Sequence, residues 1–135
     1  MIVLLQGIQT HFKTSVVATT LRTLINAIYL GRAPNNVKYP FVEVRIPTEA
    51  SGLNSSCFKD EPSVEFHTWD SGRNGDRALT IAAELETVFR TVDFPLTGGQ
   101  AIVISNKDLG ILLEEPDSKG WHHILTIGYE INRNR

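Results

Sequence analysis

The stretch that decides the fold is residues 121–131, WHHILTIGYEI. Large and mostly apolar side chains occupy every second position, namely Trp121, His123, Leu125, Ile127, Tyr129 and Ile131. The residues between them are mostly polar or small. Because successive side chains of a strand point to opposite faces of a sheet, this alternation predicts one long strand with a buried face. Its length favours a central position in the sheet.

Two shorter strand patterns lie upstream. Apolar and charged positions alternate along residues 41–46, in the order Val42, Glu43, Val44, Arg45 and Ile46. This order is typical of a half-buried strand whose charged residues occupy the other face. Residues 63–69 alternate in the same way, and the pattern predicts that Val64 and Phe66 are buried. The polar segment between them, residues 47–62, is long enough for a functional or mobile loop.

Two further strands are predicted just before the long one. They cover residues 100–105 and 109–115 and flank a turn at residues 106–108. The first of them could also pair with another part of the sheet.

The clearest helical period lies at residues 74–90. Its apolar positions recur at helical spacing and are Ala78, Ile81, Ala82, Leu85, Val88 and Phe89. This spacing predicts a helix with one buried stripe, which a polar side chain within residues 70–74 would cap. Glu84 and Glu86 fall on its solvent side, and Asp93, Pro95 and the Gly98-Gly99 pair are expected to end it and turn the chain.

Two more helices are expected at the start of the chain. Residues 3–13 place Leu4, Leu5, Ile8 and Phe12 on one side. Residues 16–25 form a second, shorter helical pattern, and a short apolar stretch at residues 27–30 follows it. The predicted order of helices and strands gives an α+β fold, with a mostly antiparallel sheet and helices packed on one side. A length of 135 residues suits a single domain spanning residues 1–135.

Composition excludes several functional classes. A formal net charge of -2 provides no broad basic field of the kind that general nucleic-acid binding requires. No apolar stretch approaches the roughly 20 residues of a membrane span. No basic residue precedes the apolar run at residues 2–5, so a secretory signal is not expected. The single Cys57 fits a reducing cytoplasm, and we expect the protein to leave the cell only as part of a larger particle.

The histidines do not indicate a metal site. His11, His67, His122 and His123 show no zinc-ligand spacing with each other or with Cys57. His122 and His123 are adjacent on a predicted strand, so they point to opposite faces and cannot chelate one ion together. We expect one of them at the surface and the other half-buried, and we expect no metal and no cofactor.

Catalytic patterns are equally weak. Cys57 and His67 could in principle form a nucleophile and base pair, but one Cys and one His in a chain of this size recur by chance. The glycine-containing turns lack the phosphate-binding patterns, and the paired acids lie in segments that water normally solvates. We therefore predict no catalytic residues and no enzymatic activity.

A set of structural motifs resembles one protein family. Residues 27–34, AIYLGRAP, lead into residues 40–44, PFVEV, as a short Ile-Tyr strand leads through a Pro turn into a Pro-aromatic-Val strand. Residues 64–69, VEFHTW, then precede a Gly-, Arg- and Asp-rich entry into the helix at residues 74–90. With the closing strand, the chain resembles the tail terminator, or tail completion, family of tailed phages and gene transfer agents over nearly its full length.

The resemblance implies a non-enzymatic virion protein that forms a ring, typically a hexamer. That ring would sit on the head-proximal end of the tail tube, stop its polymerisation and join it to the head connector. The implied partners are other copies of the chain, the tail tube protein and the head-completion or connector protein. DNA would pass through the ring without sequence-specific binding, and assembly would take place in the host cytoplasm before the protein enters the virion.

The candidate residues for contacts with partner proteins lie in a long polar loop and at the basic end of the sequence. The loop at residues 48–61 is polar yet carries the apolar Leu53 and Phe58, which a loop exposed only to water would not need. The candidate interface residues are Leu53, Asn54, Phe58, Lys59, Arg133 and Arg135. Three alternatives stay open from the sequence: a neck or head-completion adaptor, a small enzyme using Cys57 and His67, and a ligand-binding α+β domain.

The enzyme alternative yields a direct test. We expect Cys57→Ser to leave folding and assembly unchanged, because nothing in the sequence sets a base or a metal ligand beside this thiol. Circular dichroism and native mass spectrometry of both proteins measure this. A folded Cys57→Ser protein that had lost its function would contradict the non-enzymatic interpretation.

Overall fold

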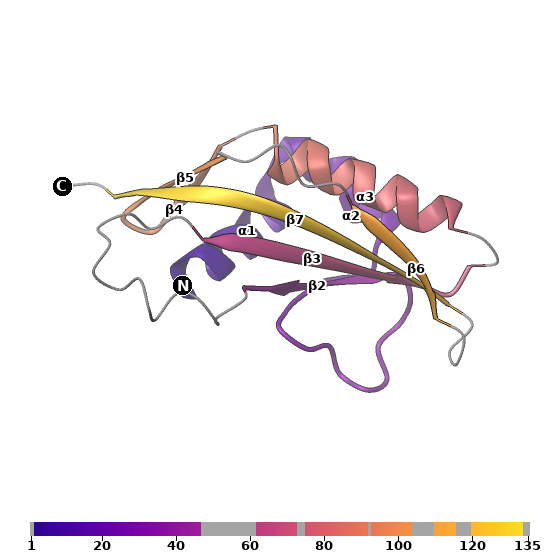
Figure 1. Ribbon diagram of the computed structural model, residues 1–135. Helices are drawn as coiled ribbons and strands as arrows, with labels where there is room; N and C mark the ends of the chain where they lie inside the picture. The colour runs from indigo at the N-terminus through magenta and orange to yellow at the C-terminus, as the bar shows by residue number, and fades with distance from the viewer. Residues whose placement is uncertain are drawn as a thin grey trace, which may run out of the picture.

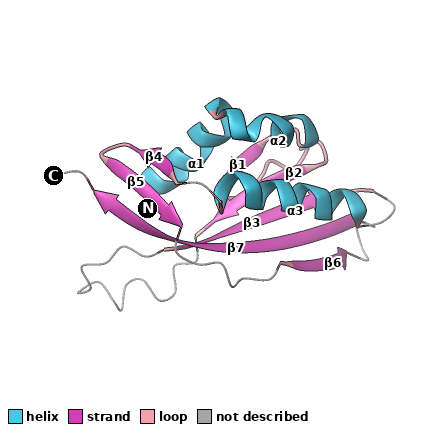
Figure 2. Ribbon diagram, turned by 90° about the horizontal axis from the view of Figure 1, so that it is seen from above, coloured by secondary structure: helices cyan, strands magenta, loops and turns pink. Residues whose placement is uncertain are grey.

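In the described part of the chain, seven strands form one curved sheet, and helices cover one of its faces (Figures 1 and 2). The computed structural model describes residues 2–46, 62–72, 75–91, 93–103, 110–115 and 120–133. The helices are α1 (Ile2–Thr14), the short 3₁₀ helix η1 (Val16–Ala18), α2 (Thr19–Leu24) and α3 (Asp76–Phe89). The strands are β1 (Ile28–Leu30), β2 (Phe41–Arg45), β3 (Ser63–Asp70), β4 (Phe94–Leu96), β5 (Gly99–Val103), β6 (Ile111–Glu115) and β7 (Gly120–Arg133).

Strand β7 organises the sheet. It pairs antiparallel with β3 through residues 121–128, with β6 through residues 120–124 and with β5 through residues 129–133. The strand order is β1-β2-β3-β7-β5-β4, with β6 also beside β7. The β1–β2 pair is parallel, and the other pairs are antiparallel. This arrangement confirms the predicted α+β class, and the long closing strand is central as expected.

The hydrophobic core lies between the helices and the inner face of the sheet. The strands β2, β3 and β7 contribute Val42, Val44, Val64, Phe66, Leu125, Ile127 and Tyr129. The helices α1 and α3 contribute Leu4, Ile8, Phe12, Ile81, Leu85, Val88 and Phe89. The apolar side chains that recur at helical spacing in α1 and α3 therefore pack against those that alternate along the strands, in one apolar layer.

A buried tyrosine fastens the end of α3 to the central strand. The Tyr129 hydroxyl donates a hydrogen bond of 2.6 Å to the carbonyl of Phe89, the last residue of α3. Burial raises the pKa of Tyr129 well above its ordinary value, so the hydroxyl keeps its proton and remains a donor. The bond thus satisfies one carbonyl that the helix end leaves without an intrahelical partner.

The predicted elements agree with the observed ones at most positions. Residues 3–13 lie in α1, and residues 16–25 cover η1 and α2. The 74–90 prediction corresponds to α3, and all six of its apolar positions are buried. Val64 and Phe66 are fully buried in β3, as their alternation predicts.

The segment before β7 differs from the prediction of two strands that flank one turn. Strands β5 and β6 match the two predicted strands, but each pairs with a different part of β7. Strand β5 also forms a hairpin with β4, which the sequence did not predict. Residues 97 and 98 make the hairpin turn, and Gly98 has a φ of 78°, a conformation that side chains disfavour. Pro95 is exposed in β4, where a missing N–H group is tolerated.

The start of α3 also differs from the prediction. Its N-cap residue is Gly75, which makes no side-chain capping bond. Asp70 was a candidate cap, but its fully buried carboxylate accepts hydrogen bonds from the guanidinium of Arg77 in the first turns of α3. The ion pair raises the pKa of Arg77, although desolvation opposes the shift. This pair holds the helix start against β3 in place of a cap.

Gly7 explains how α1 can approach β4. A Cβ atom at this position would lie 2.2 Å from the Leu96 side chain and 3.4 Å from the Pro95 carbonyl oxygen. A glycine weakens a helix interior by about 1 kcal/mol relative to alanine. Here it allows the close contact between α1 and β4.

The packing of the core predicts that truncating Leu85 on α3 lowers the stability of the protein strongly. Leu85 is fully buried, so Leu85→Ala should lower the free energy of unfolding by about 2 to 5 kcal/mol. Leu79 on the same helix is 47% exposed, and Leu79→Ala should change it by no more than about 0.5 kcal/mol. Urea denaturation followed by circular dichroism measures both. Equal losses for the two variants would contradict the observed helix register.

Candidate functional site

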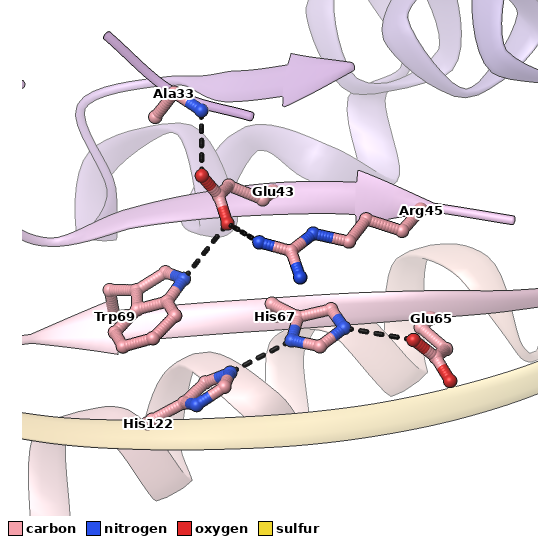
Figure 3. A network of polar contacts seen from close by, with 7 residues as sticks. All are labelled: Ala33, Glu43, Arg45, Glu65, His67, Trp69 and His122. Carbon is pink, nitrogen blue, oxygen red and sulfur yellow. Dashed lines mark hydrogen bonds and ion pairs between the residues drawn. The ribbon is translucent and has the colours of Figure 1, made fainter. Parts of the chain in front are cut away.

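Polar side chains gather on the outer face of the sheet, which is turned away from the helices. Alternation along β3 sends Val64 and Phe66 into the core, so Glu65, His67 and Trp69 point the other way. They join side chains of β2 and β7 in a polar network (Figure 3). This outer-face network consists of Ala33, Glu43, Arg45, Glu65, His67, Trp69 and His122.

Glu43 is the centre of the network on β2. One carboxylate oxygen accepts the backbone N–H of Ala33 at 2.6 Å. The other accepts the Arg45 guanidinium at 2.5 Å and the indole N–H of Trp69 at 3.1 Å. Only 5% of Glu43 is exposed. A buried carboxylate with three donors is well satisfied, so it can hold the 31–40 connection and β3 against β2.

The pKa of Glu43 reflects opposing effects. Burial raises the pKa, because it disfavours the charged form. The hydrogen bonds from Ala33, Arg45 and Trp69, together with the Arg45 charge, outweigh burial and bring the pKa below its ordinary value. The carboxylate is therefore the form that the folded protein prefers.

Two histidines continue the network onto β7. His67 Nδ1 lies 2.8 Å from His122 Nε2, and His67 Nε2 lies 3.0 Å from a carboxylate oxygen of Glu65. Trp69 stacks on His122 with ring centroids 3.7 Å apart and an interplanar angle of 12°. Trp69 and His122 are directly paired in the β3–β7 ladder, which brings their rings together.

This arrangement links neighbouring strands of the sheet. Each ring nitrogen of His67 has a partner, Glu65 for Nε2 and His122 for Nδ1. Within the described ranges, no group of three or more His, Cys, Asp or Glu residues is arranged to hold a metal ion. The network can join β2, β3 and β7 and fix their register.

Two expectations about this face were wrong. The strand at residues 41–46 was expected to be half-buried, yet Glu43 is as buried as its apolar neighbours because the network encloses it. His122 and His123 do point to opposite faces, but neither is at the surface, with 8% and 5% exposed. The signal that could have found the site is the Glu65, His67 and Trp69 spacing, which puts these polar residues on one strand face.

Two other histidines are buried on the helix side. Burial lowers the pKa of His123, and the Glu86 charge on α3 only partly opposes this. Burial also lowers the pKa of His11, against a hydrogen bond from its ring nitrogen to the Val88 carbonyl at 2.9 Å. His11 stacks on Phe94 at 4.9 Å between ring centroids. Both rings therefore favour the neutral form and act as core residues.

Most of the predicted interface residues lie in segments that the structure does not describe. Leu53, Asn54, Phe58, Lys59 and Arg135 lie outside the described residues, as does Cys57. Arg133 is the last residue of β7, where its backbone pairs with Gly99 of β5. None of the helices in the described ranges is long and apolar enough to cross a membrane.

Comparison with solved structures finds the same fold in proteins of a gene transfer agent and a phage. A chain of the native gene transfer agent virion aligns with a TM-score of 0.71 at 13% sequence identity, covering 96% of this chain and 95% of that one. The gp17 protein of bacteriophage SPP1 aligns with a TM-score of 0.62 at 19% identity, covering 97% and 91%. The predicted resemblance to this group of proteins is confirmed at the level of the fold. No family model and no curated protein sequence matches the chain.

The network makes a prediction about pH. Because the folded pKa of Glu43 is below its ordinary value near 4.5, ionisation of Glu43 stabilises the fold above that pH. Glu43→Gln should therefore cost about 1 to 3 kcal/mol at neutral pH. The difference from the unmodified protein should shrink as the pH falls through the folded pKa, since Glu43 is then protonated.

Unfolding free energies measured from pH 7 to pH 3 give this difference directly. Loss of stability caused by His11 and His123 is common to both proteins and cancels. Glu130→Gln, at an exposed position on the outer face of β7, is the matched control and should lower the free energy of unfolding by no more than about 0.5 kcal/mol at pH 7. A constant Glu43→Gln penalty down to pH 3 would show that the carboxylate charge contributes nothing.

Proposed function

We propose that this protein is a non-enzymatic virion component that forms a ring on the head-proximal end of a tail tube. The ring stops tube polymerisation and presents a surface to the head connector. The observation that carries the proposal is the shared fold with a chain of the gene transfer agent virion, which extends over 96% of this chain. The motifs of the sequence support the same assignment independently.

The outer-face network supports the non-enzymatic part of the proposal. His67 bonds His122 across β3 and β7, and Glu43 bonds Trp69 across β2 and β3, so these buried side chains serve contacts between strands. The proposed partners are further copies of this chain, the tail tube protein and the connector. A formal net charge of -2 suits a conduit that DNA traverses without tight binding.

A ring places a strict demand on the subunit surface. Each subunit must use one surface for the preceding copy and a different surface for the following copy, because a closed ring has head-to-tail contacts. The loop at residues 48–61 is the proposed source of one contact, through Leu53, Asn54, Phe58 and Lys59. Arg133 and Arg135 are proposed to contact a partner from the other end of the chain.

The loop proposal is tested by replacing residues 53–59 with a Gly/Ser segment of equal length. We expect a folded monomer that forms no rings and does not cap tail tubes, because its apolar contact residues are gone. Native mass spectrometry measures assembly, and electron microscopy of tube lengths measures termination. A Gly/Ser replacement of residues 35–38 in the β1–β2 connection is the matched control.

The outcomes separate the possible roles. Normal rings from the 53–59 replacement would overturn the loop contact. An intact protein that stays monomeric even with tail tubes made from the tube protein of its own particle would overturn the ring. Rings that bind the connector but leave tube length unchanged would identify a neck adaptor instead.

A further inference from the structure

Exposed aliphatic side chains mark one end of the sheet. In the described ranges, β6 pairs with β7 alone, and its residues Ile111 and Leu113 are 55% and 42% exposed. They lie opposite Ile124 and His122 in the ladder, so they project on the outer face. Leu112, between them, points inward and meets the position of Gly75. An edge strand with two exposed aliphatic side chains on one face is typical of a contact surface.

An apolar cavity marks the other end of the sheet. Its volume is about 190 Å³. It lies between the first turn of α1, the β4–β5 turn and the end of β7, and is lined by Val3, Leu4, Leu96, Thr97, Gly98, Gly99 and Ile131. An apolar cavity of about 150 Å³ accepts a benzene-sized molecule, so this one has room for an aliphatic side chain.

The two ends also differ in their electrostatic character. Glu114 is exposed directly beside Leu113 on β6. The cavity, in contrast, adjoins the start of α1, where unpaired N–H groups give a partial positive charge and no acidic residue lies in the first turn. A carboxylate thus follows the aliphatic pair along β6, and the cavity adjoins a helix start that favours negative charge.

We propose that Ile111 and Leu113 of one subunit dock into this cavity of the next copy of the same chain. The proposal rests on the proposed ring and adds two surfaces to the contact proposed for the loop at residues 48–61. Figures 1 and 2 both show β6 and the β4–β5 hairpin at opposite ends of the molecule. A subunit thus offers its aliphatic pair to one neighbour and its cavity to the other, which is the head-to-tail contact that a ring needs.

Two variants each remove one surface. Leu113→Asp puts a carboxylate where the cavity requires an apolar group, and Val3→Trp fills the cavity from its 38% exposed rim position. Each variant alone should be monomeric, with self-association at least about tenfold weaker than in the unmodified protein. Mixed in equal amounts, the two should form a 1:1 heterodimer and nothing larger. The reason is that Leu113→Asp retains a cavity and Val3→Trp retains an aliphatic pair.

Native mass spectrometry over a range of concentrations reads out these states. Leu79→Asp and Val16→Trp are matched controls, because they make the same changes at residues 47% and 87% exposed in the helical layer. They should assemble as the unmodified protein does. Ile111→Asp and Thr97→Trp probe the same two surfaces and replace any member of the first pair that fails to fold.

The outcomes distinguish this contact from the ring itself. Rings from the unmodified protein and from both variants would overturn the contact and leave the ring in place. Monomeric variants that form no heterodimer would also overturn it, because the lost surfaces would not be each other's partners. An unmodified protein that forms no ring, with or without tail tubes, would overturn the ring and this contact together.

Discussion

Antiparallel pairing along β7 is the constraint on which the rest of the structure depends. β3 and β6 pair with the same residues at its start, so they lie on opposite edges of it, and β5 pairs with its end. A one-residue slip of β7 would exchange its two faces, because side chains alternate. It would move Leu125 and Ile127 out of the core and break the Tyr129 bond to α3. Packing of the inner face of β7 against the core thus fixes the register in which β7 pairs with the strands on both of its edges.

The outer face depends on the same register in a different way. The stacking of Trp69 on His122 and the bond from His67 to His122 exist only when β3 and β7 are aligned as observed. Glu43 then connects β2 through Trp69. A buried polar network is costly when partly satisfied, so each misaligned pairing would leave buried donors or acceptors unpaired. The network therefore adds specificity to a sheet whose stability comes mainly from the apolar face.

The sequence predicts the features that repeat within one segment. The period of α3 and the alternation of β3 and β7 are local patterns, and their core residues could be named in advance. The burial of Glu43 could not be predicted in this way. Two of its hydrogen-bond donors, Ala33 and Trp69, lie ten and twenty-six positions away in the sequence. β4 was missed because three residues containing a proline show no period, and only pairing with β5 makes them a strand. The site was missed for the same reason, since it consists of contacts across strands.

The length and curvature of β7 bear on how a ring could close. The strand has 14 residues and spans roughly 45 Å at about 3.3 Å per residue, with β6 at one end and the cavity at the other. Under the proposed head-to-tail contact, the rotation between neighbours is set by the angle between these two ends. A flexible sheet would allow several angles and hence open chains or rings of mixed size. By fixing the strands of the sheet relative to one another, the buried polar groups of the outer face would favour closure into a ring of one size.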